Sequence, residues 1–322
     1  MAVSLYEASL VAEANGQHGP AGVMQTFVRA SPLMAALPVE DIMGAAYVWT
    51  REVSLGTNAF RNIGGSFTAS EGQSEARSIP LKAIGGEIDV DTMILRTMGM
   101  GIRAQKEEAK IADLAQRIAY NIIKGTTTSI GGATGDPKGF DGLQARYGAG
   151  FTSVAVNTAG ENSAQIIDNA VAALSMRNLD IAIQATQDPT HLLLPKKMIL
   201  NITGYLRNSS SITQTKDEYG RMVTAYAGLP MIPVDPLGTV SGLAGSAFNE
   251  SAAATSTSIY VVNMSDQGLH LVQNGGIIVS DLGEVQASPV YRTRVQWFCN
   301  VVDPHPRCVT RLHGITDLVA VA

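Results

Sequence analysis

The chain has 322 residues and a formal net charge of −5 at pH 7; 45% of its residues are hydrophobic and 16% are charged. This length allows a large buried core in one domain or two, whereas the acidic balance argues against a general nucleic-acid-binding domain, for which a basic footprint is usual. The sequence contains no run of 18 apolar residues, so we expect no membrane span. The absence of a basic cluster at the start argues against a signal peptide.

Residues 1–45 predict an arm rather than an independent core. A stretch of glycine and small residues, EANGQHGPAG at 13–22, precedes a segment with two prolines and a few scattered apolar anchors. Such a segment buries too little apolar surface to fold alone. We expect a strap laid over its own subunit or a neighbouring one, with these anchors: Phe27, Leu33, Met34 and Leu37.

Residues 46–90 predict a long hairpin. Residues 46–55 alternate as a strand does, and 78–90 have the character of a returning extended segment. Between them, 56–77 form the tip, which contains the run FRNIGGSFTASEG at 60–72. Loops this long are usually functional or disordered, and this one offers neither a nucleophile–base pair nor a set of metal ligands.

Residues 91–124 predict a helix of about 50 Å, with Asp91 as its N-cap and Gly125 just past its end. Gly99 and Gly101 each weaken a helix by about 1 kcal/mol relative to alanine, so we expect a bend there. Basic residues recur at every seventh position, which keeps them on one edge of a helix: Arg96, Arg103, Lys110, Arg117 and Lys124. The opposite side is expected to carry Met98, Ile102, Ala109, Ala112, Ala119 and Ile123. The basic edge is either a solvated face or a contact to carboxylates of a neighbouring subunit or to nucleic acid.

Beyond a connection rich in glycine and threonine at 125–160, the pattern alternates between helix and strand. Helical spacing predicts helices at 162–176 and 195–208. Short apolar runs predict strands at four places: 180–185, 191–195, 229–235 and 258–264. Residues 236–257 predict a loop of small residues.

Residues 290–302, VYRTRVQWFCNVV, predict a long strand because they alternate with period two over a dozen residues. One face carries Tyr291, Thr293, Val295, Trp297, Cys299 and Val301. The other face carries Arg292, Arg294, Gln296, Phe298 and Asn300. Beyond Pro304 and Pro306, residues 308–315 predict an adjoining strand.

Motifs that would support catalysis or cofactor binding are weak. Gly99, Gly101 and Ala104 fit the letters of a dinucleotide-binding pattern, but that pattern belongs between a strand and a helix, not inside a helix. Two cysteines and two histidines lie close in sequence without the tight spacing of a zinc site: Cys299, His305, Cys308 and His313. Two cysteines predict no disulfide framework and indicate a reducing cytoplasm. We expect no enzyme activity and no catalytic, cofactor-binding or metal-binding residues.

Taken in order, these elements resemble those of the major capsid proteins of tailed bacteriophages, which have the α+β HK97-type fold. The resemblance lies in the succession of strap, long hairpin, over-long helix, α/β region and final long strands. It also lies in five local segments: SPLMAALP (31–38), AFRNIGGSFTASEG (59–72), PLKAIGGEIDVD (80–91), GDPKGFDGLQARYG (135–148) and GLPMIPVD (228–235). Together these segments follow the chain from its first tenth to its last third.

The resemblance implies a structural protein that self-assembles into the icosahedral head of a tailed phage around double-stranded DNA. It divides the chain into an N-terminal arm (1–45), an E-loop hairpin (46–90), a spine helix and peripheral domain (91–154), an α/β axial domain (155–285) and C-terminal strands that return to the peripheral domain (286–322). The E-loop would strap one subunit to the next through Phe60, Arg61, Asn62, Phe67, Glu71 and Arg77. The basic edge of the spine helix would face DNA or a neighbour through Arg96, Arg103, Lys110 and Arg117.

The implied partners are further copies of the chain in hexamers and pentamers, a portal, packaged DNA and a decoration protein, with no membrane. Assembly would occur in the host bacterial cytoplasm, and the product would be the virion capsid. Because the helix begins near residue 91, too little chain precedes it for both an arm and a scaffolding segment, so we expect a separate scaffolding protein. The tip carries Asn58 and Asn62 but no lysine, so we expect no lysine–asparagine crosslink.

Three alternatives stay open. The shell protein of a bacterial nanocompartment shares the fold. Another virion component, such as a decoration or tail-tube protein, would lack the single long helix beside a long hairpin. An unrecognised hydrolase would need an assembled catalytic triad. The low charged fraction, below the roughly one quarter typical of soluble domains, favours a chain that buries surface against partners.

Overall fold

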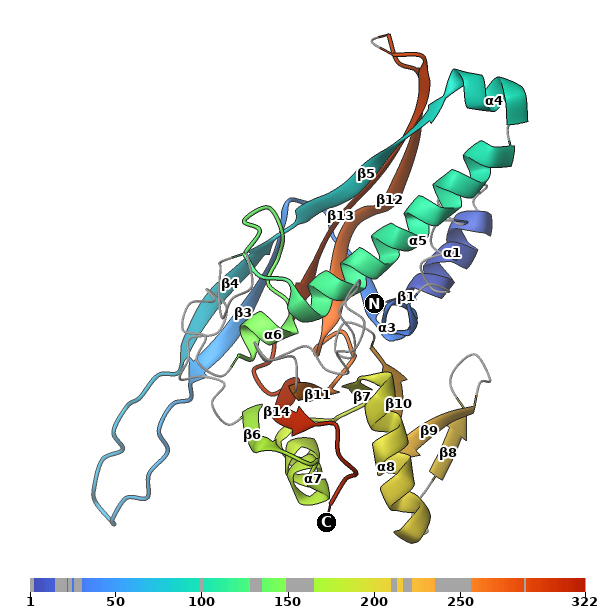
Figure 1. Cartoon of the computed structure of the whole chain (residues 1–322). Coiled ribbons are helices and arrows are strands. Elements are labelled where there is room, and N and C mark those ends of the chain that lie inside the picture. The colour runs from blue at the N-terminus through green and yellow to red at the C-terminus, as the bar shows by residue number, and fades with distance from the viewer. Residues whose placement is uncertain are drawn as a thin grey trace.

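The computed structural model describes residues 3–14, 22, 25, 31–98, 101–127, 135–148, 165–209, 213–216, 222–234, 256–286 and 288–321. The strands in these residues form a five-stranded sheet, a seven-stranded sheet and a two-stranded ribbon. In Figure 1 the five-stranded sheet and its long helix form the upper body, the seven-stranded sheet lies below, and the ribbon extends to the lower left. Within the described residues, no helix combines the length and apolar character needed to cross a membrane.

The five-stranded sheet is built around β13 (Val290–Val302), which pairs antiparallel with β12 (His270–Glu284) on one side and with β5 (Lys82–Asp91) on the other. β2 (Pro38–Asp41) runs parallel to β12, and β1 (Val3–Ser4) forms the edge. The predicted strand at 290–302 and its alternation are confirmed, because one face is buried: Thr293, Val295, Trp297, Cys299 and Val301.

The opposite face of β5 and β13 carries a ladder of ion pairs. Arg292 donates from Nε and Nη2 to the two carboxylate oxygens of Asp89, each at 2.7 Å. Arg294 donates from Nε to Glu87 at 2.8 Å. The Arg292 hydrogen bond holds the pKa of Asp89 below its ordinary value. Polar residues that alternate with the core face therefore pair with one another across the two strands.

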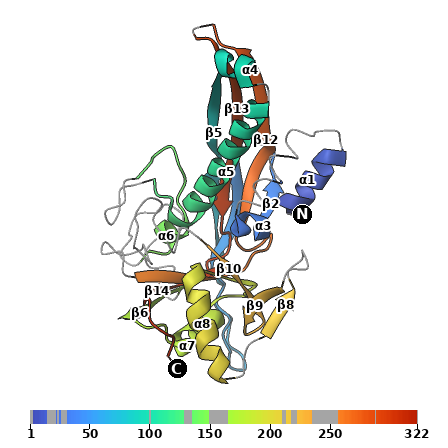
Figure 2. The same cartoon turned by 45° about the vertical axis from the view of Figure 1, so that its right-hand side comes forward.

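The N-terminal segment packs into the same core. α1 (Leu5–Ala14) and α3 (Pro32–Ala36) lie beside the β2–β12 edge of the sheet (Figure 2). The predicted anchors at 33, 34 and 37 are buried, as is Leu5, and all four belong to the main hydrophobic cluster. Phe27 lies outside the described residues. The described part of the arm is thus held by its own subunit.

α5 (Gly101–Lys124) lies along the core face of the five-stranded sheet (Figures 1 and 2). Its buried side chains recur every three or four residues: Leu114, Ala115, Ile118, Ala119, Ile122 and Ile123. The predicted apolar side was wrong in part, because Ala109 is exposed and Ala112 is only half-buried. Burial on α5 begins at Leu114, so the apolar side covers only the second half of the helix.

The predicted single helix at 91–124 is wrong. α4 (Thr92–Met98) and α5 (Gly101–Lys124) are separate helices, and they point in different directions (Figure 1). Gly101 is the first residue of α5, and Gly99, the other position at which we expected a bend, lies outside the described residues. Asp91 acts as the predicted cap, because its carboxylate accepts a hydrogen bond from the Met93 amide at 2.7 Å.

The end of α5 depends on Gly125. A Cβ at this position would lie 2.4 Å from the Asn121 carbonyl oxygen and 2.6 Å from that of Phe140. Only glycine allows the chain beyond α5 to approach the segment that leads into α6 (Leu143–Arg146). The predicted helix terminator is confirmed.

The seven-stranded sheet has the order β6-β14-β11-β7-β10-β9-β8; α7 packs against β14 and β6, and α8 packs against β10. The elements of this part of the chain are β6 (Ile166–Ala172), α7 (Met176–Ala185), β7 (His191–Leu194), α8 (Lys196–Ser209), β8 (Thr213–Lys216), β9 (Met222–Tyr226), β10 (Leu229–Pro233), β11 (Ser256–Val262) and β14 (Val309–Thr316). The strands expected at 191–195, 229–235 and 258–264 and the helix expected at 195–208 are confirmed to within a few residues. Most of the expected loop at 236–257 lies outside the described residues.

Two predicted elements have the wrong type. The helix expected at 162–176 is largely strand β6, because these residues pair in parallel with β14. The strand expected at 180–185 is the second half of helix α7, whose buried Met176, Leu179 and Ala182 follow a three-residue spacing. A short apolar run does not distinguish a strand from a buried helix, and tertiary pairing decided both cases.

β14 does not adjoin β13. It pairs with β11 and β6 in the seven-stranded sheet, so the expectation of an adjoining strand is wrong. Because β12 belongs with β13 in the five-stranded sheet, the expected segment boundary at 285/286 does not coincide with a boundary between sheets. The chain passes from one sheet to the other through residues 303–308.

The hairpin is shorter than predicted at its tip and longer in its strands. β3 (Ala46–Ser54) and β4 (Gln73–Pro80) pair antiparallel and leave residues 55–72 as the tip. The returning strand begins at residue 73 rather than 78 because Ser74, Glu75 and Ala76 pair with residues of β3 despite their small or polar side chains. Residues 82–91 are not part of the ribbon, since they pair with β13.

We predict that Gly85→Ala destabilises the protein by about 1–3 kcal/mol, the range for a side chain forced into a packed site. A Cβ at position 85 would lie 2.3 Å from the Val295 carbonyl oxygen, so β5 and β13 would have to separate. The matched control is Gly204→Ala in α8, where nothing lies within 4 Å and alanine should stabilise the helix by up to about 1 kcal/mol. Urea unfolding measures both, and equal effects would contradict the close approach.

Candidate functional site

The hairpin tip exposes large apolar side chains. The relative exposures of Phe60 and Ile63 are 108% and 106%, and Leu55 and Phe67 are also exposed. The tip is nevertheless shaped by contacts of its own: Thr57 and Ser70 exchange hydrogen bonds of 2.7 and 2.9 Å. Exposed apolar groups clustered on one projecting segment are typical of an interaction surface.

Five of the six predicted contact residues lie on this tip, all of them exposed: Phe60, Arg61, Asn62, Phe67 and Glu71. Arg61 donates to the Gly65 carbonyl at 3.1 Å and lies 5.1 Å from the Phe67 ring centroid. Arg77 lies instead within β4, opposite Trp49, and forms an ion pair with Glu75 at 3.2 Å. Contact between subunits through these residues stays a prediction.

The basic edge of the long helix is not one continuous surface. Arg96 is exposed on α4, whereas Arg103 on α5 turns to the sheet. Its guanidinium lies 2.9 Å from Glu107, 2.8 Å from Asp281 and 2.8 Å from the Thr293 hydroxyl. Arg103 therefore joins α5 to β12 and β13 within one subunit, a role that neither sequence interpretation included.

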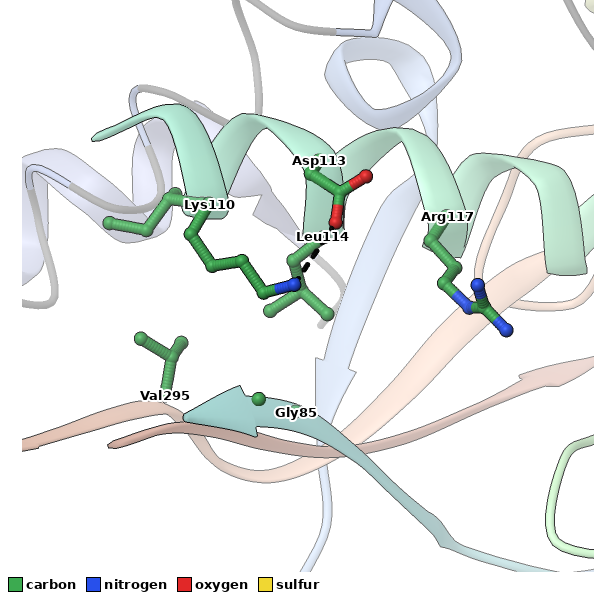
Figure 3. Close-up of a pocket in the computed structure, with 8 residues that line it drawn as sticks. Gly85, Lys110, Asp113, Leu114, Arg117 and Val295 are labelled. Carbon is green, nitrogen blue, oxygen red and sulfur yellow. Dashed lines mark hydrogen bonds and ion pairs between the residues drawn. The ribbon is translucent and has the colours of Figure 1, made fainter. Parts of the chain in front are cut away.

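Further along α5, Lys110 and Arg117 line a hollow of about 320 Å³ between the helix and the sheet (Figure 3). The floor includes Gly85 and Val295. Lys110 reaches Asp113 at 3.4 Å, an exposed pair that contributes at most about 1 kcal/mol. This part of the edge is partly neutralised by its own helix.

A larger groove of about 560 Å³ lies at the base of the hairpin, and we call it the hairpin-base groove. One wall is formed by β3 residues from Tyr47 to Ser54 together with Leu55, and the other by residues 266–267 and 304–306. The indole Nε1 of Trp49 is buried and has no hydrogen-bond partner among the described residues. No sequence pattern indicated this groove, because its two walls lie more than 200 positions apart.

His270 lies at the junction of the arm, the ribbon and the five-stranded sheet. It is fully buried, its Nδ1 is 3.0 Å from the Gly268 carbonyl, and its ring meets the Tyr47 ring edge-on at 5.6 Å. Its Nε2 is 3.4 Å from a Glu40 carboxylate oxygen, but this is an ion pair only when the ring is protonated. Burial lowers the pKa of His270 below 6.5 and outweighs the attraction of nearby carboxylates, so the ring is neutral at pH 7.

A buried polar joint holds α6 against the end of β13. Arg146 forms an ion pair with Asp303 at 2.6 Å and donates to the Val301 carbonyl at 2.8 Å. The Tyr147 hydroxyl donates to the other Asp303 oxygen at 2.9 Å. Burial and the Asp303 charge raise the pKa of Tyr147 well above its ordinary value, so this hydroxyl stays a donor.

The structure does not assemble the cysteines and histidines into a site. Cys299 and Cys308 are free and buried, and burial raises the pKa of Cys299 to about 12. His313 lies 3.6 Å from Asp168. Across the part of the chain that the structure describes, no three histidine, cysteine, aspartate or glutamate side chains are grouped closely enough to hold a metal ion.

No family profile matches the sequence, and no curated protein matches it. Solved structures match nearly all of it. An encapsulin complex from Synechococcus elongatus matches with a TM-score of 0.62 and 13% identity over 90% of this chain and 89% of that one. The capsid of a native GTA particle matches with a TM-score of 0.56 and 12% identity over 89% and 90%. A structure of Mycobacterium phage Bobi matches with a TM-score of 0.54 and 12% identity over 92% and 90%.

These similarities confirm the α+β HK97-type fold expected from the resemblance to tailed-phage major capsid proteins. At 12–13% identity they establish the fold. The same fold occurs in phage capsids and in an encapsulin.

We predict that Asp303→Asn lowers the free energy of unfolding by about 3–5 kcal/mol, because it leaves the buried Arg146 cation without its carboxylate. The matched control is Asp113→Asn, which removes the exposed partner of Lys110 and should cost less than about 1 kcal/mol. Urea unfolding of both variants checks this. Similar losses of unfolding free energy in both variants would show that the buried ion pair contributes no more to stability than the exposed one.

We predict that stability falls as the pH drops below 6.5, the ordinary pKa of histidine, because the unfolded chain then binds a proton that folded His270 resists. His270→Gln should flatten this slope. His305→Gln is the control, since His305 also has a lowered pKa but is less buried. Thermal melts between pH 5 and 8 measure the slope, and an unchanged slope in His270→Gln would contradict the assignment.

Proposed function

We propose that this protein is the structural subunit of a closed icosahedral shell, and specifically the major capsid protein of a tailed phage head that encloses double-stranded DNA. The observation that carries the proposal is the HK97-type fold, which phage capsids share with this chain over about nine tenths of its length. The five sequence segments that resemble tailed-phage capsid proteins support the phage reading.

In this proposal the elements take the roles that the resemblance implies. The ribbon β3–β4 with its tip is the E-loop, α5 is the spine helix over the peripheral sheet, and the seven-stranded sheet forms the axial domain. The exposed tip residues strap one subunit to the next. A stable interface usually buries about 1,600 Å² in total, and a shell with several such contacts per subunit is stable through multivalency even when each contact is weak.

The proposed assembly consists of hexamers and pentamers of this chain, with a portal, a separate scaffolding protein and packaged DNA as partners and a decoration protein as a further candidate. Its place is the virion, after assembly in the bacterial cytoplasm. We propose no catalytic role. The net negative charge supports an inner wall that does not trap DNA non-specifically.

The second candidate is the shell of a bacterial nanocompartment. The observation in its favour is the TM-score of 0.62 with the encapsulin, against 0.56 and 0.54 for the two phage-like capsids. Both candidates are shells of one fold, and they differ in what is enclosed.

Negative-stain electron microscopy tests the shell. The protein is expressed alone and then with its neighbouring genes. Polyhedral particles, or pentamer and hexamer rings, are expected, whereas monodisperse monomers in both preparations would refute the proposal. Co-purified DNA or portal protein supports the phage head, and a co-purified enzyme inside the particles supports the nanocompartment.

We predict that replacing residues 58–69 with two glycines yields a folded subunit that does not form stable shells. Thr57 and Ser70 already lie within hydrogen-bond distance, so β3 and β4 keep their register while the exposed apolar residues are removed. Circular dichroism and microscopy check both parts of the prediction. Ser66→Ala on the same tip is the control and should assemble normally. Normal shells without the tip would show that it is not a strap.

A further inference from the structure

Residues 274–276 form a bulge in the long strand β12. The pairing of β12 with β13 holds at Gln273 and resumes at Ile277, so three residues of β12 stand opposite a single residue of β13. On the other edge of β12, the pairing with β2 ends at Gln273. The backbone of the bulge therefore lies outside both ladders, as is usual for extra residues in a strand.

The bulge contains an asparagine followed by a glycine, Asn274–Gly275, and both residues are exposed. Gly275 has a φ of 72°, which glycine adopts without strain, and a Cβ at this position would meet nothing within 4 Å. The backbone amide nitrogen of Gly275 is thus covered neither by a side chain of its own nor by the surrounding structure. Among the described residues, no other asparagine precedes a glycine. Asn15–Gly16, the other such pair in the sequence, lies outside the described residues.

An exposed asparagine before glycine can lose its side-chain amide. The deprotonated backbone nitrogen of Gly275 attacks Cγ of Asn274, so that an N–Cγ bond forms, the Cγ–Nδ2 bond breaks and the side-chain nitrogen leaves as ammonia. The resulting succinimide ring takes up one water molecule and opens at either carbonyl, to aspartate or to isoaspartate. The reaction consumes only water, and it is one reason why asparagine is a thermolabile residue in proteins.

The side chain of Asn274 has a structural role that this reaction would end. Its Nδ2 donates a hydrogen bond to the Gly44 carbonyl oxygen at 2.9 Å. Gly44 lies between β2 and β3, where the N-terminal arm leads into the ribbon. An ionised carboxylate accepts hydrogen bonds but donates none, so the product would place a carboxylate oxygen against a carbonyl oxygen. Either product therefore removes this tie between β12 and the base of the ribbon.

The remainder of the ribbon base is held by other contacts. The Asn300 side chain donates to the Pro80 carbonyl at 2.7 Å, and the Leu81 amide donates to the Ala45 carbonyl at 2.8 Å. The extra backbone atom of isoaspartate would fall in a bulge that lies outside both ladders. The subunit can therefore stay folded after the modification, while the base of its ribbon is held less firmly.

We propose that Asn274 is a site of spontaneous deamidation in the folded protein, and that the modification loosens the base of the ribbon. It converts a neutral donor into an anion without an enzyme and without a change elsewhere in the subunit. The inference does not depend on the proposed shell function, because every atom involved belongs to one chain.

Peptide mapping by mass spectrometry tests the site. The purified protein is incubated at mildly alkaline pH and then digested, and a sample digested without incubation gives the baseline. The peptide that contains Asn274 should gain the mass of an amide-to-acid replacement and should become a substrate for a protein-isoaspartate methyltransferase. Asn62 is the matched control, because it is exposed on the tip but precedes Ile63, and it should convert many-fold more slowly. Conversion at mildly acidic pH should be slower, since less of the Gly275 amide is deprotonated.

Two outcomes would overturn the site. Conversion of Asn15 with intact Asn274 would show that the fold protects the bulge. Equal conversion of Asn62 and Asn274 would show that neither the glycine nor the bulge directs the reaction.

Hydrogen exchange tests the loosened ribbon base. The Leu81 amide should exchange several-fold faster in the incubated protein and in Asn274→Asp than in the fresh protein. Asn274→Gln keeps an amide donor and should resist conversion, so its Leu81 amide should exchange at the same rate before and after incubation. Unchanged exchange at Leu81 in fully converted protein would overturn the structural consequence, even if Asn274→Asp did not fold.

Discussion

The ion pair between Arg146 and Asp303 lies where the chain leaves the five-stranded sheet, and Arg311 of β14 donates to the backbone carbonyl of the adjacent Tyr147 at 2.8 Å. Asp303 follows β13 directly, and six residues later the chain enters β14 of the other sheet. Two charges removed from water stabilise a fold only when their geometry is close and their remaining oxygens are satisfied, and Tyr147 meets that condition here. Because Val301 and Val309 on either side of this joint share one hydrophobic cluster, the orientation of the sheets is fixed by the same packing that buries the pair.

Because the two sheets share one hydrophobic core, the subunit can fold without burying most of the ribbon. Among the described residues, a small cluster of Ile79, Val272 and Val302 packs the base of the ribbon against the body, and the large apolar side chains of the tip stay exposed. Exposed phenylalanine side chains do not stabilise an isolated subunit. The arrangement is reasonable for a chain that completes its packing by association, because the apolar surface is then buried between copies.

The long helix shows how one residue can have a role that periodicity does not reveal. Arg103 belongs to a regular series of basic residues, yet its bonds to Glu107 and Asp281 make it part of the subunit's own frame. Lys110 and Arg117 remain at the rim of a hollow beside the sheet. A stripe of like residues on a helix therefore divides into structural and surface members according to whether a polar partner on the sheet lies within reach.

The sequence alone determined the features that depend on local chemistry. Period-two alternation identified β13, and Asp91 and Gly125 marked helix ends. The ordered series of segments also identified the HK97-type fold. The sequence did not reveal which residues pair over long distances. Residues 166–172 form a strand because they pair with β14, and β14 pairs in the seven-stranded sheet rather than with β13. The hairpin-base groove likewise exists only because residues near 50 and near 305 meet, and such meetings are decided by the free energy of the whole packed core rather than by any local pattern.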